Sequence, residues 1–333
     1  MRVSYSELHD ILFRVLARTG FTRERATRCA ALFADASRDG VYSHGLNRFP
    51  QFITTIRNGV VDVDAVPRCL ARWGALERWD GRRGAGNLNA QHAMARAIDL
   101  SRDQGIGCVA LANTNHWMRG GSYGWQAAEA GAIGICWTNT LPNLPPWGAT
   151  DPRVGNNPLV VAVPRPQGHV VLDMALSQFS VGALVAYRTR GEALPVAGGY
   201  DTEGRLTCDA AAIEASGRLL PIGFWKGSGL SIVLDLAGAL LSGGNATWQV
   251  PADPRKETGL SQVFVAFDLS SVADAHVAAR VADQIVDHVR QPSGSDDTVK
   301  YPGQRTLETR RRNLAEGIPV EPSIWHQVQE LAA

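Results

Sequence analysis

A histidine and an arginine four positions apart are the first residues of this sequence whose types and spacing suggest chemistry. Ser43 can cap a helix N-terminus, and the helix is predicted to end at Asn58-Gly59, so that His44 lies in its first turn and Arg48 one turn later on the same face. An imidazole can protonate a carbonyl oxygen, and a guanidinium can bind a carboxylate through two hydrogen bonds. The pair suits a 2-keto acid, and an exposed His and Arg on an amphipathic helix are the alternative.

A second polar segment follows a short apolar run, residues 106–112, which is typical of a buried strand. Ligands of α/β proteins bind where strands end, so residues 113–121 are predicted to form the floor of a pocket. The candidate substrate-binding residues in this segment are Asn115, His116, Trp117 and Arg119. A helix cap or a contact with a loop carbonyl is the structural alternative for His116.

Asp173 and Lys226 each lie at the end of an apolar element. An Asp at the end of a strand must be exposed or hydrogen-bonded, and Asp173 could orient an imidazole, bind ribose hydroxyls or cap a helix. Lys226 and Gly227 open a strongly apolar helix, residues 227–241, whose apolar face we expect to be buried, with its amides fixed in direction. A Lys and glycines at a helix N-terminus favour a diphosphate site.

The usual dinucleotide fingerprint, GxGxxG between a strand and a helix, is missing from this sequence. The glycines from Gly81 to Gly86 have the wrong spacing for it and are interpreted as a turn. A nucleotide would therefore be bound by another kind of fold.

Apolar periodicity predicts an α/β fold with helical ends. Strands are expected within residues 69–80, 106–112, 133–137, 159–164, 170–174 and 263–267, and helices at 5–19, 23–37, 44–57, 87–104, 123–130, 178–190, 227–241, 272–290, 305–315 and 322–332. Residues 191–222 are expected to be partly irregular. We predict an α/β domain over residues 69–271 and a mainly helical domain that combines residues 1–68 with 272–333.

The composition is that of an ordinary globular enzyme, with 333 residues, 45% hydrophobic and 20% charged. Lys plus Arg number 33 and Asp plus Glu 32, and the net charge of +1 gives no attraction to nucleic acid or to an anionic membrane. The five cysteines form no CxxC pair, so neither a disulfide framework nor a metal site is predicted, and a cytoplasmic location is expected. No apolar run approaches the ~20 residues of a membrane span.

Several short motifs together resemble the malate/L-lactate dehydrogenase family, and the resemblance covers nearly the whole chain. The motifs are Ser43-His44-Gly45 with Arg48, Asn115-His116, Asn157-Pro158, Leu172-Asp173-Met174 and Trp225-Lys226-Gly227. The resemblance implies a nicotinamide-binding α/β fold that is not a Rossmann fold, a homodimer, and His44 as the catalytic acid/base, to which we add Asp173. It also implies cofactor contacts at His169, Val170, Val171, Leu172, Asp173, Met174, Ala175, Trp225, Lys226, Gly303, Gln304 and Arg305.

The predicted reaction transfers a hydride from the nicotinamide to the 2-keto carbon of a keto acid, while His44 protonates the oxygen and Arg48 holds the carboxylate. Trp117-Met118 replaces the Phe-Gly of many relatives, and this difference resembles a subgroup that acts on sugar-derived acids. NADH is expected as the cofactor in preference to NADPH. Malate, lactate, ureidoglycolate and cyclic imine carboxylates stay open as substrates. A non-catalytic sugar-acid or nucleotide-binding protein is the alternative of another class, and the intact His44 argues against it.

Overall fold

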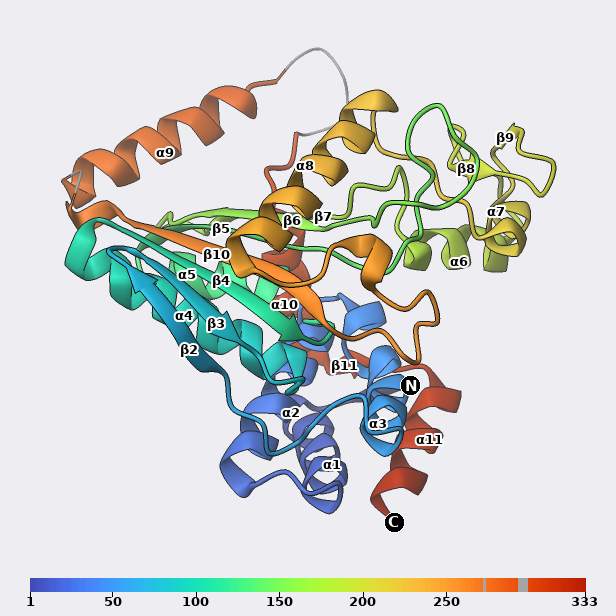
Figure 1. The fold of residues 1–333 in the computed structure, drawn as a ribbon, viewed down its shortest axis with the longest axis horizontal. Helices are drawn as coiled ribbons and strands as arrows, with labels where there is room; N and C mark the ends of the chain where they lie inside the picture. Colours follow the sequence, from blue (N-terminus) through green and yellow to red (C-terminus); the bar gives the residue numbers. More distant parts are fainter. Residues whose placement is uncertain (272–273, 293–298) are drawn as a thin grey trace.

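The computed structural model describes residues 1–271, 274–292 and 299–333. The centre of the molecule is a mixed β-sheet (Figure 1). Seven strands of the described residues form it in the order β2-β3-β4-β10-β5-β6-β7. Only the β3–β4 pair is parallel, and the other neighbouring pairs are antiparallel. The strands are β2 (Arg68–Trp73), β3 (Leu76–Asp80), β4 (Ile106–Thr114), β5 (Ala132–Thr138), β6 (Leu159–Val163), β7 (Val170–Met174) and β10 (Leu260–Asp268). The predicted α/β class is confirmed.

Helices cover both faces of this sheet. Helices α4 (Gly86–Gln104) and α5 (Gly121–Glu129) pack on one face, and α8 (Trp225–Ser242) packs on the other. Strand β5 shows the alternation that this requires. Gly134 faces α5, because a Cβ at this position would lie 2.5 Å from Ala127. Trp137, three residues later, faces the other side of the sheet, where its indole donates a hydrogen bond to the carbonyl of Leu234 in α8 at 3.0 Å.

Helices from the two ends of the chain share a second core below the sheet (Figure 1). They are α1 (Tyr5–Arg18), α2 (Arg23–Arg38), α3 (Phe49–Arg57) and α11 (Pro322–Ala332), with a short strand pair, β1 (Arg2–Val3) and β11 (Ile318–Pro319). Helix α10 (Gln304–Glu316) packs against α2, and its Leu307 packs on the core of the sheet. Buried side chains of α1, α2, α3 and α11 meet in one cluster that includes Leu8, Phe33, Phe52 and Trp325. Ser4 and Thr22 cap α1 and α2 by accepting amide hydrogen bonds.

Helix α9 (Ala275–Val289) does not join that cluster of N- and C-terminal helices. It lies beside the sheet, where Asp283 pairs with Arg165 of the β6–β7 turn at 2.6 Å (Figure 1). The first two residues of the helix predicted over 272–290 lie outside the described residues. The division of the chain into domains at residues 68 and 272 stays a prediction, and the packing of α9 favours grouping it with the sheet.

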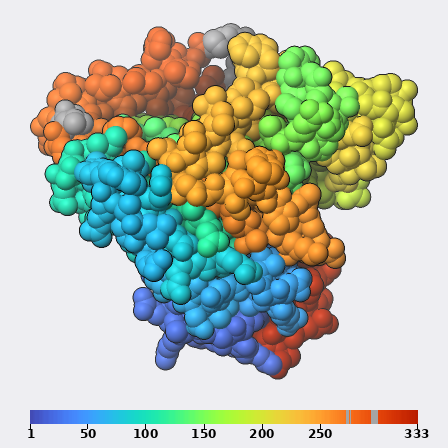
Figure 2. Space-filling view, viewed as in Figure 1, coloured from blue at the N-terminus to red at the C-terminus, as the bar shows by residue number. Residues whose placement is uncertain are grey.

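The prediction that α8 buries its large apolar side chains is wrong. The residues of α8 that face the sheet are mostly small, namely Gly227, Ser228, Ser231, Leu234, Gly238 and Ser242. Its exposed side includes Val233, Leu236 and Leu240, which are 58%, 55% and 74% exposed. Small residues allow the helix backbone to approach the sheet closely, which leaves the large side chains exposed. Figure 2 shows the residues of α8 at the surface of the molecule. The α8 amides are still fixed in direction, but by this close packing.

Residues 178–222 form a small excursion beyond the last strand of the sheet. It contains α6 (Val181–Arg190), α7 (Ala210–Ser216) and a pair of two-residue strands, β8 (Gly199–Tyr200) and β9 (Leu206–Thr207). Leu184, Leu194 and Ile213 give it a core of its own. None of the helices in the described part of the chain has the length and apolar character needed to cross a membrane.

Candidate active site

The segment that carries His44 and Arg48 is a pair of 3-10 turns and not the start of an α-helix. The turns are η1 (Tyr42–His44) and η2 (Leu46–Arg48), and α3 begins only at Phe49. The predicted capping role of Ser43 is therefore wrong. Pro50 explains the difference, because it lacks an amide proton and its ring clashes with the carbonyl four residues back, so it is accommodated in the first turn of a helix.

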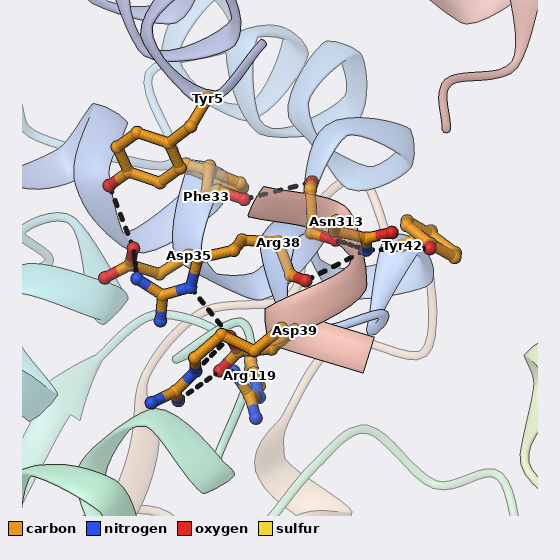
Figure 3. Close-up of polar contacts among 10 residues, drawn as sticks. Tyr5, Phe33, Asp35, Arg38, Asp39, Tyr42, Arg119 and Asn313 are labelled. Atoms are coloured by element: carbon orange, nitrogen blue, oxygen red, sulfur yellow. Dashed lines mark hydrogen bonds and ion pairs between the residues drawn. The ribbon is translucent and has the colours of Figure 1, made fainter. Parts of the chain in front are cut away.

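The turn around His44 is held against helix α2. The Ser37 hydroxyl accepts a hydrogen bond from the amide of Leu46 at 2.8 Å. Gly45 lies so close to Ser37 that a Cβ at this position would be 2.2 Å from its hydroxyl oxygen, so only glycine fits. On the other side, the amide of Asn313 from α10 donates to the phenol of Tyr42 at 3.2 Å (Figure 3). Elements from both ends of the chain thus fix the position of His44.

A buried carboxylate, Asp39, lies just before this turn and gathers three arginines (Figure 3). It accepts hydrogen bonds from Arg119 at 2.6 Å, from Arg310 at 2.7 Å and from Arg38 at 2.8 Å. Burial alone raises the pKa of Asp39, but the hydrogen bonds and charges of the three guanidinium groups outweigh it and hold the pKa well below its usual range. The cluster joins α2, α10 and the segment after β4, and nothing in the sequence pattern predicted it.

The imidazole of His116 lies against that of His44, with ring centroids 6.0 Å apart and an angle of 20° between the planes. Its Nδ1 accepts the amide hydrogen of Met118 at 3.0 Å, so the neutral ring carries its proton on Nε2. Burial, Arg48 and His44 lower the pKa of His116 well below its usual value. His116 is therefore a neutral hydrogen-bond donor at physiological pH.

His44 has a pKa below the usual value of 6.5. Burial is the largest cause; Asp173 raises the pKa, and the charges of Arg48 and Arg119 lower it. Its Nδ1 lies 2.9 Å from the hydroxyl of Ser43. A hydroxyl can donate to the neutral ring and accept from the protonated ring, so Ser43 can support both states of His44 while Nε2 stays available for proton transfer.

Arg48 and His116 line a small cavity between α3 and the segment that precedes β10. Its other lining residues are Gln51, Phe52, Thr55, Val61, Asn115, Met118, Pro254 and Glu257. Among the described residues, no protein oxygen accepts a hydrogen bond from the Arg48 guanidinium, which leaves it available for an anionic ligand. The predicted residues Arg48, Asn115 and His116 thus meet in one cavity, and Glu257 was not predicted.

Two residues predicted to bind the substrate have side chains that point away from the cavity. The side chain of Trp117 is 2% exposed and packs on Tyr123 and Phe264 in the core of the sheet, so its ring does not line the cavity. Arg119 is 5% exposed, and its guanidinium forms an ion pair with Asp39. In both cases the sequence showed a polar or aromatic residue in a functional loop but not the direction of its side chain.

Asn115 lines the cavity but has a structural role as well. Its amide nitrogen donates to the backbone carbonyls of Arg83 at 2.7 Å and Gly84 at 2.9 Å. Its side-chain oxygen is buried and accepts no hydrogen bond from any described residue. Asn115 therefore ties the loop to the turn at Gly81–Gly86.

The three segments predicted to contact the cofactor meet along β7. The amide of Val171 donates to the carbonyl of Pro302 at 3.0 Å, which places Gly303 against this strand, and a Cβ on Gly303 would lie 3.1 Å from the carbonyl oxygen of His169. The amide of Ile222 donates to the carbonyl of Leu176 at 2.8 Å, which places the start of α8 beside the end of β7. The predicted residues are therefore neighbours, from His169 to Ala175, Trp225 to Gly227 and Gly303 to Arg305.

These segments suit a nicotinamide dinucleotide. Strand β7 is the last in the sheet order, and Leu172 and Trp225 are 37% and 65% exposed, which offers apolar surface to a ring. Lys226 is exposed at the N-terminus of α8, where an ammonium group and helix amides favour a diphosphate. Asp173 is exposed and accepts the Gly121 amide at 2.7 Å, so it caps α5 as well as influencing His44.

The site combines a titrating imidazole, a neutral imidazole donor, a guanidinium without a partner in the described part of the chain, and a surface suited to a dinucleotide. This combination defines an oxidoreductase site for a small anionic carbonyl compound.

Comparisons with known proteins support this class of enzyme. The sequence of residues 3–329 matches the malate/L-lactate dehydrogenase family. The chain belongs to this family, and a nicotinamide cofactor follows from that membership.

Individual relatives are similar along their whole length. A 2,3-diketo-L-gulonate reductase from Escherichia coli O1:K1 is 46% identical over 99% of this chain and 100% of its own. A delta1-piperideine-2-carboxylate reductase structure from Pseudomonas syringae is 31% identical, with a TM-score of 0.89 and coverage of 99% of each chain. A sulfolactate dehydrogenase structure from Methanocaldococcus jannaschii is 26% identical, with a TM-score of 0.92 and coverage of 99% of this chain and 96% of that one. The two solved structures have the fold of this chain, and the names of the three proteins specify different acids.

Proposed function

We propose that this protein is an NAD(P)H-dependent reductase that converts 2,3-diketo-L-gulonate to 3-keto-L-gulonate. The reaction class is supported by the position of Arg48, which lines one cavity with His116, next to His44, and whose guanidinium has no hydrogen-bond acceptor among the described residues. The substrate is supported by the 46% identity to reductases of that name. Oxidation of NADH and of NADPH should be measured with this compound, pyruvate, oxaloacetate and a cyclic imine carboxylate. A higher kcat/KM for a short or cyclic acid would replace the proposed substrate.

In the proposed mechanism, Arg48 binds the substrate carboxylate and orients the adjacent keto group. The cofactor supplies the hydride when bound. His116 donates a hydrogen bond from Nε2 without changing its own charge, and His44 delivers a proton from Nε2 to the carbonyl oxygen. Burial disfavours protonated His44 and Asp173 favours it, so we expect proton uptake to accompany the binding of an anionic substrate.

The pH dependence of the rate follows from the pKa of His44. Reduction requires protonated His44, so kcat/KM should fall as the pH rises through its pKa, which lies below 6.5 in the free protein. Asp173→Asn removes the charge that raises this pKa, keeps an oxygen for the Gly121 amide, and should move the falling limb to lower pH. Stopped-flow pH profiles of both proteins measure the shift. If the falling limb of the variant stayed in place or moved to higher pH, Asp173 would not be the group that raises the pKa of His44.

Lys226 is expected to contribute to cofactor affinity. Lys226→Ala should weaken NADH binding about 10- to 100-fold, the effect of losing one charge-assisted hydrogen bond. The side chain is exposed, so the melting temperature of the free protein should hardly change. Fluorescence titration with NADH gives the dissociation constant, and Lys256→Ala, an exposed lysine outside the three segments along β7, is the control. An unchanged constant for Lys226→Ala would assign the diphosphate to other groups near Asp173.

We also propose that the protein is a cytoplasmic homodimer. The resemblance to the family implies the dimer, and α8 and α9 each expose a row of apolar side chains that a second copy could cover. The row on α9 is Val277, Val281, Ile285 and Val289, which are 44%, 45%, 60% and 53% exposed. The five free cysteines favour a reducing compartment. Light scattering should give twice the 35.8 kDa mass of one chain, and a monomer would refute the proposal.

A further inference from the structure

A buried acid that the proposed mechanism does not use faces Arg48 across the cavity. Glu257 lies in the segment between η3 (Thr247–Gln249) and β10, and it is 6% exposed. Its Oε1 accepts the amide hydrogen of Leu141 at 3.2 Å. Among the described residues no donor reaches its other oxygen, and Glu257 lines the same cavity as Arg48 and His116.

The carboxylate of Glu257 is not neutralised by a direct ion pair with any described residue. Burial raises its pKa, and only the more distant charge of Arg48 and the amide of Leu141 oppose this effect. An unpaired buried carboxylate is costly to a fold, so such a group beside a ligand cavity is a candidate for ligand recognition.

The space between these side chains is narrow. The cavity measures about 20 Å³, which is room for about one water molecule. A ligand that binds Arg48 must therefore contact Glu257 or push it aside. The side-chain amide of Gln51 in α3 donates a hydrogen bond to the carbonyl of Pro254 at 3.4 Å, so the 251–259 segment lies against α3 beside Arg48.

We propose that Glu257 determines specificity for the part of the substrate beyond the keto group, by accepting hydrogen bonds from its hydroxyl groups and repelling a second anionic group. This inference rests on the proposed 2-keto acid site around Arg48. Hydrogen bonds from hydroxyls to a carboxylate are strong, and a carboxylate or sulfonate in the same place would bring two like charges together. Glu257 thus favours a polyhydroxy monocarboxylate over a dicarboxylate.

Binding of non-reducible acids tests this without any need for turnover. Calorimetry should compare L-gulonate, L-lactate and L-malate, which carry a hydroxylated tail, a methyl group and a second carboxylate. Glu257→Gln keeps the shape and removes the charge. It should raise the dissociation constant of L-gulonate at least about tenfold, the lower end for the loss of a hydrogen bond to a charged group. The dissociation constant of L-lactate should change by less than about twofold, and that of L-malate should fall.

Asp253→Asn is the matched control, because Asp253 lies in the same segment, pairs with Arg255 and does not line the cavity. It should leave all three affinities unchanged. Equal weakening of L-gulonate and L-lactate by Glu257→Gln would mean that Glu257 only holds Arg48 in place, and unchanged affinities would mean that the tail binds elsewhere; either result overturns the proposal. Failure of the wild-type protein to reduce any keto acid would refute the proposed function instead, since the binding ratios are measured independently.

Discussion

Replacing His44 by Ala should lower kcat for keto-acid reduction by at least about 10²-fold, the low end of what a positioned general acid contributes. The ring is in contact with His116, near Arg48, and Asp173 raises its pKa, so it is a titrating group at the centre of the site. Cofactor affinity should change little, because the segments along β7 are intact. Single-turnover kinetics with saturating cofactor measures the effect on chemistry.

The exposed His326 of α11 provides a control for the loss of an imidazole as such. His326→Ala should retain wild-type turnover. If His44→Ala also kept near wild-type turnover at every pH, the proton would have to come from His116 or from solvent, and the assignment of His44 as the acid would be wrong.

Arg48→Lys should lower kcat/KM for the keto acid about 10- to 100-fold, mainly through KM, because an ammonium cannot reproduce the two parallel hydrogen bonds of a guanidinium. An amide analogue of the substrate lacks the carboxylate charge and should be affected much less. The comparison separates carboxylate binding from packing, since a packing defect would reduce both substrates equally.

Arg57→Lys is the matched control, because Arg57 is exposed at the other end of α3. It should leave both substrates unaffected. If Arg48→Lys lowered kcat/KM equally for the acid and for the amide, Arg48 would support the cavity wall and would not bind the carboxylate.

The residues of the site were more predictable from the sequence than their backbone. His44 and Arg48 were chosen for helical spacing, yet they lie on successive 3-10 turns. The two side chains are still close enough for the charge of Arg48 to lower the pKa of His44. Pro50 was the local signal that could have placed the start of α3 correctly.

Helix α8 shows why apolar content does not identify the buried face. Its length and position were predicted well, but its large residues point outward and its Gly and Ser residues face the sheet. Which face is buried depends on how closely the neighbouring strands approach, and on what covers the outer face in an assembly. Neither is encoded in the periodicity of this segment alone.

The groups that the sequence did not reveal act through long-range contacts. Asp39 joins Arg119 and Arg310, which are 80 and 271 positions away in the chain. Glu257 faces Arg48 from the segment before β10, and no local motif marks it as part of the site. Such groupings depend on the sheet order, in which β10 inserts between β4 and β5, and this order was not predicted.

The most direct test of the account is a crystal structure of the protein with NADH and a non-reducible analogue of the keto acid. We expect the analogue between α3 and the 251–259 segment, with its carboxylate on Arg48 and the oxygen on C2 within about 2.6–3.2 Å of His44 Nε2. The nicotinamide should lie beside β7. An analogue bound away from Arg48 and His44, or a cofactor bound away from β7, would contradict the assignment of this cavity as the active site.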